Sequence, residues 1–171
     1  LQGFADHAVA AKPLGAYADR WEAFVQGAPE APRVTVIGAG VGGAELAMAS
    51  AYRLRRAGRK PVVTLLERAD TALPSIGAGA RAALLAQLAQ HGVTLLTGAS
   101  PAVIGPAQVV LQSGQIIGSD FTLSVAGARP QAWLGKTGLA LSDGFITVGP
   151  TLQSSDPAVF AAGDCAHMAF A

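Results

Sequence analysis

Cysteine is almost absent from this sequence, which limits the chemistry that its side chains can support. The single cysteine, Cys165, cannot form an internal disulfide, and no histidine or cysteine cluster has the spacing of a metal site. These absences predict no bound metal and favour a reducing, cytoplasmic setting.

Charged residues and long apolar runs are also scarce. The formal net charge of +1 is too balanced to indicate a nucleic-acid partner. No apolar run reaches the ~18 residues of a transmembrane helix. The longest uncharged stretch, residues 82–119, is interrupted by glutamine, histidine, glycine and proline, so no transmembrane segment is expected. The chain begins at Leu1 without a signal-peptide pattern, which suggests a piece of a longer protein.

The sequence is rich in small and apolar residues, with 51% hydrophobic residues and 21 glycines, as is typical of a tightly packed α/β chain. Buried strands and helices alternate from residue 33 to residue 98. We predict strands at 33–37, 61–67 and 93–98, and helices at 44–58 and 79–92. Such units with short loops indicate parallel pairing with right-handed crossovers. The expected fold is therefore a Rossmann-like, three-layer α/β domain with a central parallel sheet.

The flanking segments follow other patterns. Residues 107–127 hold short β-rich runs separated by Ser-Gly and Gly-Ser, which predict a small antiparallel β-meander whose last strand, 121–127, rejoins the parallel sheet. Further strands are expected at 145–148 and 158–164. Near the start, apolar residues at helical spacing predict an amphipathic helix that begins after Pro13 and ends near Gly27. This helix either packs on its own domain or connects to a domain outside the chain.

The turn after the first strand of the alternating part carries the pattern G-x-G-x-x-G as Gly38, Gly40 and Gly43. Gly38 permits the tight turn, Gly40 lets the backbone approach a pyrophosphate, and Gly43 lets the helix pack close to the sheet. The phosphates would lie at the helix N-terminus, beside Val41 and Gly42, where free N–H groups face them. The surrounding strand, helix and acid favour this interpretation over a glycine-rich turn without a ligand.

The acid is Glu67, at the end of the second strand of that part. Its carboxylate can accept hydrogen bonds from both ribose hydroxyls and would repel a 2′-phosphate, so NAD is favoured over NADP. NADP remains an alternative, because Arg68, next to Glu67, could bind the 2′-phosphate. Glu45 is predicted in the first helical turn, where it either complements the helix dipole or points towards the far end of a bound dinucleotide. The basic cluster is interpreted as a solvated helix end that complements the helix dipole, with an anion site as the alternative; it consists of Arg53, Arg55, Arg56, Arg59 and Lys60.

Three segments together resemble a known family: VTVIGAGVGGAELA, SVAGARP and TLQSSDPAVFAAGDCA. They are similar to the pyridine nucleotide-disulfide oxidoreductase superfamily, flavoenzymes in which an NAD(P)H-binding domain is inserted within an FAD-binding domain. The combination of Gly42, Gly43, Glu45 and Ala47 resembles the type II NADH dehydrogenases. The last segment and residues 12–24 resemble the flavoprotein module that is fused to selenide, water dikinase in some bacteria.

The resemblance implies further site residues. The aspartate that matches Asp164 hydrogen-bonds the ribityl chain of FAD, and Gly163 lets the backbone come close. Residues 127–130, which begin with Gly127, cross from the NAD domain back to the FAD domain near the pyridine nucleotide, and Glu45 lies close to the nicotinamide. Cys165 lacks a partner cysteine and His167 is not expected to act as a base, so no catalytic side chain is predicted.

The resemblance also divides the chain. Residues 1–31 would be a connector helix segment from the FAD domain, 32–150 the NAD(P)H-binding domain, and 151–171 a return segment of the FAD domain. Only one fingerprint is present, so the rest of the FAD domain is expected outside this chain. With that cover missing, the segment after Gly163 is expected to be loosely ordered or packed by a neighbouring molecule.

The implied function is passage of a hydride from NADH to FAD in the full-length parent, with the fragment alone inactive. The alternative is a dinucleotide-sensing or interaction module without electron transfer. The parent is expected to be cytoplasmic or membrane-peripheral, and its electron acceptor stays open: a quinone, a thiol-disulfide, a selenium compound or another protein.

Overall fold

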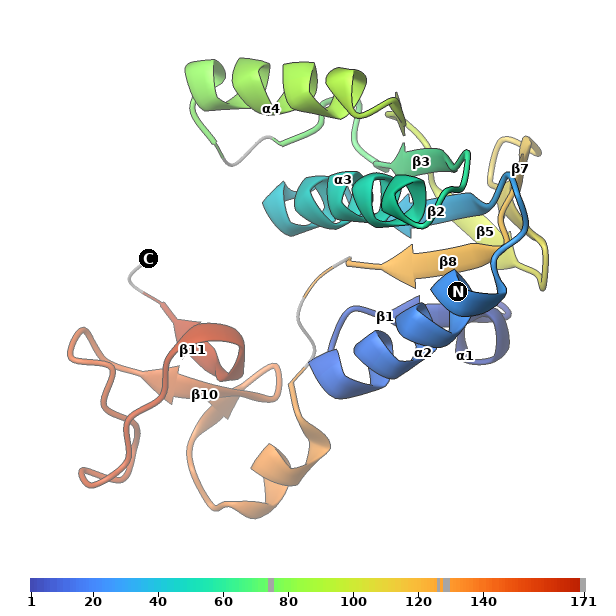
Figure 1. Cartoon of the computed structure of the whole chain (residues 1–171). Coiled ribbons are helices and arrows are strands. Elements are labelled where there is room, and N and C mark those ends of the chain that lie inside the picture. The colour runs from blue at the N-terminus through green and yellow to red at the C-terminus, as the bar shows by residue number, and fades with distance from the viewer. Residues whose placement is uncertain (74–75, 126, 128–129, 170–171) are drawn as a thin grey trace. The chain divides into compact units, whose positions relative to one another are not determined.

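The structure is a computed structural model that describes residues 1–73, 76–125, 127 and 130–169 (Figure 1). It consists of two compact units, residues 1–126 and 127–171, and each is described by itself. The predicted boundaries at 31/32 and 150/151 concern the parent protein and stay a prediction.

A five-stranded parallel sheet forms the middle layer of the first unit. Its strands lie in the order β1-β8-β2-β3-β4, and each neighbouring pair is parallel. Their bounds are β1 (Ala8–Ala10), β2 (Arg33–Ile37), β3 (Val62–Leu66), β4 (Val93–Leu96) and β8 (Phe121–Ser124). The predicted parallel sheet is confirmed, including the return of residues 121–124 to it, whereas β1 was not predicted.

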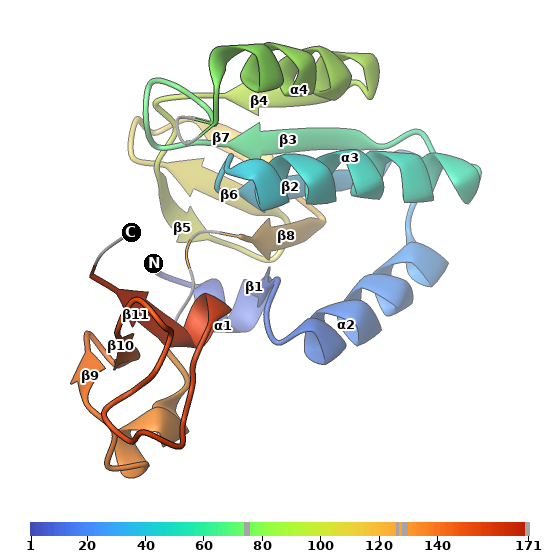
Figure 2. The same cartoon turned by 90° about the vertical axis from the view of Figure 1, so that its left-hand side faces the viewer.

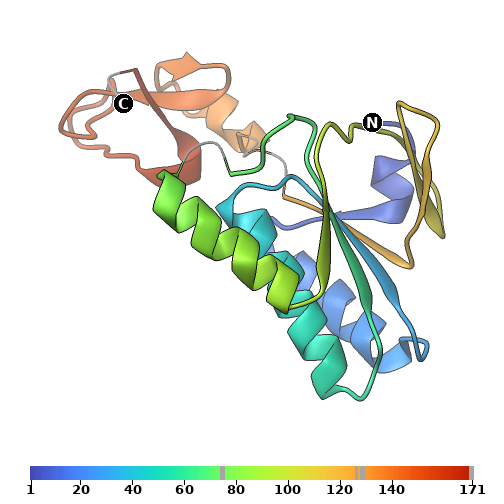
Figure 3. The same cartoon turned by 90° about the horizontal axis from the view of Figure 1, so that it is seen from above.

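Three helices cover one face of this sheet (Figures 2 and 3): α2 (Leu14–Gly27), α3 (Val41–Arg56) and α4 (Ala78–Gln90). α3 faces the strands with alanine, because Ala44, Ala47 and Ala51 are fully buried in one cluster with valines and leucines of β2 and β3. Such small side chains let a helix approach a sheet closely, and interiors of this density leave little room for added atoms.

α2 packs on the same sheet through aromatic contacts. The rings of Trp21 and Phe24 lie 5.3 and 4.9 Å from the ring of Phe121 on β8, and Tyr17 and Val25 are buried. Within its own unit, the predicted amphipathic helix is therefore a packing helix.

The opposite face is covered by a three-stranded antiparallel sheet and a short helix (Figure 2): β5 (Pro101–Ile104), β6 (Gln108–Leu111), β7 (Ile116–Gly118) and α1 (Phe4–His7). Ile37, Leu66, Ile104, Val109 and Leu111 form the core between the two sheets. The three layers are as predicted, but the meander begins with β5, which the sequence reading missed.

An ion pair joins β2 to the residue that precedes β8. The Arg33 guanidinium pairs with Asp120 through both carboxylate oxygens, and the Arg33 N–H also donates to Asp120 Oδ2 at 2.8 Å. These hydrogen bonds hold the pKa of the Asp120 carboxyl below its ordinary value of 3.8. Because the pKa of Asp120 is lower in the folded chain than in the unfolded one, the ion pair stabilises the fold at pH values above the ordinary pKa. This stabilisation is lost as the pH falls through the lowered pKa of Asp120.

Asp120→Asn is therefore expected to make the free energy of unfolding depend less on pH at acid pH. The free energy of unfolding of the wild type should fall more than that of the variant between about pH 5 and about pH 2.5, by less than ~1 kcal/mol because water reaches the pair. Urea unfolding at several pH values measures the difference. Parallel profiles for the two proteins would contradict a contribution from this pair.

The second unit is small and has a core of four buried residues, Leu134, Ile146, Val148 and Ala161. It contains η1 (Ala132–Lys136), β9 (Leu141–Ser142), β10 (Phe145–Val148), η2 (Gly163–Cys165) and β11 (Ala166–Met168), with the strand order β11-β10-β9.

Two expectations for this unit are wrong. Residues 158–164 do not form a strand: Phe160 makes one isolated bridge with Gln153, and Gly163 has a φ of +70°, which ends extended structure before η2. The segment after Gly163 is also not loosely ordered over residues 166–168. These residues pair in parallel with 146–148, because β10 offers them a free edge.

Candidate functional site

The glycine-rich turn follows β2 and leads directly into α3. Gly38 has a φ of +101°, a conformation that favours glycine, and its N–H donates to the Leu66 carbonyl at 2.8 Å. A Cβ atom at Gly43 would overlap the carbonyl oxygen of Gly38. The first and third glycines of the pattern are therefore both required by the backbone. Gly38 forms the tight turn that was predicted, whereas the closest approach at Gly43 is to the carbonyl of that turn rather than to a strand.

The second glycine faces open space. Gly40 is the N-cap of α3 in an extended conformation, and no atom lies within 4 Å of a Cβ built on it. The first bond of the helix runs from Ala44 N to Gly40 O at 3.0 Å, so the amides of Val41, Gly42 and Gly43 precede the helical ladder. Amides at a helix start that lie outside the helical ladder are groups that can bind a phosphate.

Glu67 lies beside this turn, as the sequence predicts. β3 neighbours β2 in register, and Glu67 comes directly after Leu66, the partner of Ile37. The carboxylate accepts hydrogen bonds from two backbone amides, Ala39 N at 2.9 Å and Ala69 N at 3.0 Å. The side-chain contact with Ala39 was not predicted, and no sequence pattern signals it. Arg68, which follows, is exposed.

Glu45 is placed differently from the expectation. α3 begins at Val41, so Glu45 is the fifth helical residue and lies in the second turn, while the first turn contains no acid. The helix dipole acts mainly within the first turn, which weakens the explanation of Glu45 as a dipole partner. Its side chain is exposed.

The remaining predicted site residues belong to the second unit. Gly127 has a φ of +78° and Gly163 one of +70°, so both adopt conformations that favour glycine. Asp164 is exposed in η2. The neighbours of Gly127 at 126, 128 and 129 lie outside the described residues. Roles for Gly127, Gly163 and Asp164 in binding cofactor stay predictions.

The basic residues at the end of α3 contact separate partners. Arg53 pairs with Glu22 at 3.1 Å, Arg55 donates to the His91 carbonyl at 2.8 Å, and Lys60 pairs with Glu30 at 2.6 Å. Arg53, Arg55 and Lys60 are exposed, as expected for a solvated helix end, whereas Nε of Arg59 is buried.

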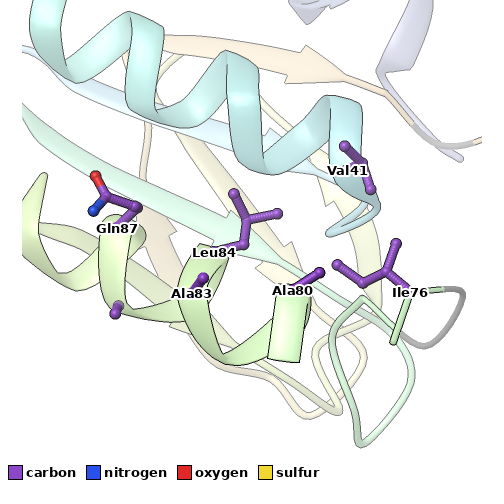
Figure 4. A pocket seen from close by; sticks show the side chains of 7 residues that line it. Val41, Ile76, Ala80, Ala83, Leu84 and Gln87 are labelled. Carbon is purple, nitrogen blue, oxygen red and sulfur yellow. The ribbon is translucent and has the colours of Figure 1, made fainter. Parts of the chain in front are cut away.

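An apolar pocket of about 570 Å³ lies between α3 and α4 (Figure 4). Val41, Ile76, Ala80, Ala83, Leu84, Ala86 and Gln87 line it. None of these side chains is titratable, so the pocket offers no acid or base. The pocket was not predicted from the sequence. The alanine-rich helix at 79–92 was a signal for it, because small side chains leave grooves between helices.

Within the described ranges, no cluster of three or more histidine, cysteine or acidic residues could hold a metal ion. Over the same part of the chain, no helix combines the length and the apolar character needed to span a membrane. The half-buried Cys165 directs its thiol to the Ala162 carbonyl at 3.3 Å.

A parallel sheet, a glycine turn that leads into a helix, and an acid directly after the neighbouring strand are typical of dinucleotide-binding α/β proteins. Residues 10–171 match the model of the pyridine nucleotide-disulphide oxidoreductase family. The chain belongs to this family, as the resemblance implied.

Individual relatives agree with this assignment. The chain is 39% identical to a nitric oxide reductase FlRd-NAD(+) reductase of Aeromonas hydrophila, over 84% of this chain and 37% of the relative. It resembles the crystal structure of an FAD-dependent pyridine nucleotide-disulphide oxidoreductase from Desulfovibrio vulgaris, with 27% identity, a TM-score of 0.72 and coverage of 97% of this chain and 42% of the other.

A third similar structure is a water-forming NADH oxidase from Lactobacillus brevis bound to NADH, at 27% identity and a TM-score of 0.73, covering 96% of this chain and 36% of the other. The chain thus spans well under half the length of these relatives. A fusion to selenide, water dikinase stays a prediction.

Proposed function

We propose that this chain is the NAD(P)H-binding portion of an FAD-dependent oxidoreductase, with NADH as the preferred nucleotide. The observation that carries the proposal is the juxtaposition of the Gly38–Gly43 turn, the open start of α3 and the Glu67 carboxylate. The amides at the start of α3 would bind the pyrophosphate, and Glu67 would face the adenosine ribose.

The residues present fit such a nucleotide. Gly40 leaves free the space that a side chain would occupy, and Gly43 allows the close approach of α3 to the turn. In the parent protein the nucleotide would supply a hydride to flavin. The residues of this chain would bind and orient the nucleotide, and none of them is required as an acid or base.

The proposed preference for NADH rests on charge. Glu67 is a carboxylate whose two oxygens already face backbone amides, and a 2′-phosphate brought near it would meet like charge. Arg68 is the residue that would work against this preference. The relatives include enzymes of both kinds, since an engineered NADPH oxidase with NADPH bound matches the fold as well as the NADH-bound oxidase does.

The isolated chain is expected to bind NADH, and to bind NADPH at least about tenfold more weakly, which corresponds to ~1.4 kcal/mol. Isothermal titration with each nucleotide measures both affinities. Arg68→Ala is the matched variant and should widen the preference for NADH. A folded chain that binds neither nucleotide would refute the proposed function.

The parent protein is expected to contain flavin. Its purified form should be yellow, and addition of NADH should bleach the flavin absorbance. A colourless parent that cannot be reconstituted with FAD would favour a sensing or interaction module instead.

A further inference from the structure

The acid beside the glycine turn makes contacts that a ribose-binding role alone does not explain. Glu67 Oε2 accepts from Ala39 N at 2.9 Å, and Glu67 Oε1 accepts from Ala69 N at 3.0 Å. Ala39 is the central residue of Gly38-Ala39-Gly40. The carboxylate therefore links the glycine turn after β2 to the segment after β3.

Two backbone hydrogen bonds tie the same two segments together. Gly38 N donates to the Leu66 carbonyl at 2.8 Å, and Leu73 N donates to the Ala39 carbonyl at 3.1 Å. The Ala39 amide lies between these two bonds and is held by the Glu67 side chain. Glu67 thus completes a set of three links to the turn.

The Ala39 amide depends on this contact because the residue is fully buried. A buried N–H that loses its acceptor and gains no water is unfavourable, and the backbone usually shifts to recover a partner. Loss of the carboxylate would therefore disturb the turn next to the amides of Val41 and Gly42, which lie at the open start of α3.

We propose that Glu67 is a positioning residue for the phosphate-binding turn, in addition to any contact with ribose. The inference rests on the proposed dinucleotide site. It predicts that a substitution of Glu67 made to admit a 2′-phosphate weakens the binding of both NADH and NADPH. Both nucleotides would bind through the same glycine turn, which the carboxylate would no longer hold in place.

Amide hydrogen exchange in the unliganded chain tests the positioning role directly. Glu67→Asp keeps the charge but shortens the side chain, so it cannot span Ala39 N and Ala69 N. The Ala39 amide should then exchange at least about tenfold faster, while amides of β4 keep their protection. Arg68→Ala is the matched control and should leave the Ala39 amide unchanged.

Glu67→Gln provides a second variant of nearly the same size, should the shortened side chain prevent folding. Its amide group presents one acceptor and one donor, so at least one of Ala39 N and Ala69 N should lose protection. Unchanged exchange at both amides in a folded variant would overturn the inference.

A nucleotide analogue separates positioning from ribose recognition. If Glu67 acted only on the ribose, Glu67→Asp would not change the affinity for NADH that lacks the 2′- and 3′-hydroxyls of its adenosine. We expect a loss of about threefold or more with this analogue also. Equal affinities of the wild type and the variant for the analogue would refute positioning. Failure of the wild type to bind NADH would refute the proposed function and leave the exchange result standing.

Discussion

Gly43→Ala is expected to lower both the stability of the chain and its affinity for NADH. The added methyl group would overlap the carbonyl oxygen of Gly38, and no side-chain rotation relieves a clash with backbone. The turn or the start of α3 must shift, at a cost of about 3 kcal/mol. Affinity for NADH should fall at least about tenfold, because the same shift moves the amides that we propose to bind the pyrophosphate.

Gly79→Ala is the matched control. Gly79 lies in the first turn of α4, and a Cβ atom built there meets nothing within 4 Å. Alanine in a helix is preferred over glycine by about 1 kcal/mol, so this variant should be slightly more stable. Urea unfolding and NADH titration of both variants measure the contrast. A Gly43→Ala protein that matches Gly79→Ala in both assays would show that the close contact at Gly43 is unimportant.

Ala47→Leu is expected to cause a comparable loss of stability by a different route. Ala47 is fully buried where α3 approaches the central strands, and three added carbon atoms have no free volume to occupy. Overpacking of this kind typically costs about 1–3 kcal/mol. Chemical unfolding measures the change in the free energy of unfolding.

Ala49→Leu tests the same substitution on the other side of the same helix. Ala49 is exposed, and leucine and alanine have similar helix propensities. The free energy of unfolding should therefore change by no more than about 0.5 kcal/mol. Equal stabilities of Ala47→Leu and Ala49→Leu would contradict close packing of α3 on the sheet.

The sequence predicts the alternating part of the fold well because each element there has a strong local pattern. β2, β3 and β4 are apolar runs, α3 follows the glycine-rich turn, and α4 has apolar residues at helical spacing. β1 and β5 escape prediction for physical reasons. β1 has three residues and gains its partner from residues 121–124, far along the chain. β5 begins at Pro101, which locally argues against a strand.

The site is predictable only in part. The position of Glu67 next to the glycine turn follows from parallel pairing of β2 and β3, which pattern alone indicates. Its bonds to Ala39 and Ala69 depend on the side-chain direction, which no spacing encodes. The turn assigned to Glu45 was wrong because the first residue of α3 is Val41, and helix boundaries are the weakest part of such predictions.

The strand order of the central sheet has a consequence for how the chain acquires its fold. β8 is the sheet neighbour of both β1 and β2, although more than a hundred residues separate β1 from it along the chain. During synthesis, residues 8–10 therefore wait for residues 121–124 to leave the ribosome before they can pair in the sheet. The β2–β3–β4 unit needs no such delay, so we expect it to form first and β8 and β1 to join the sheet afterwards.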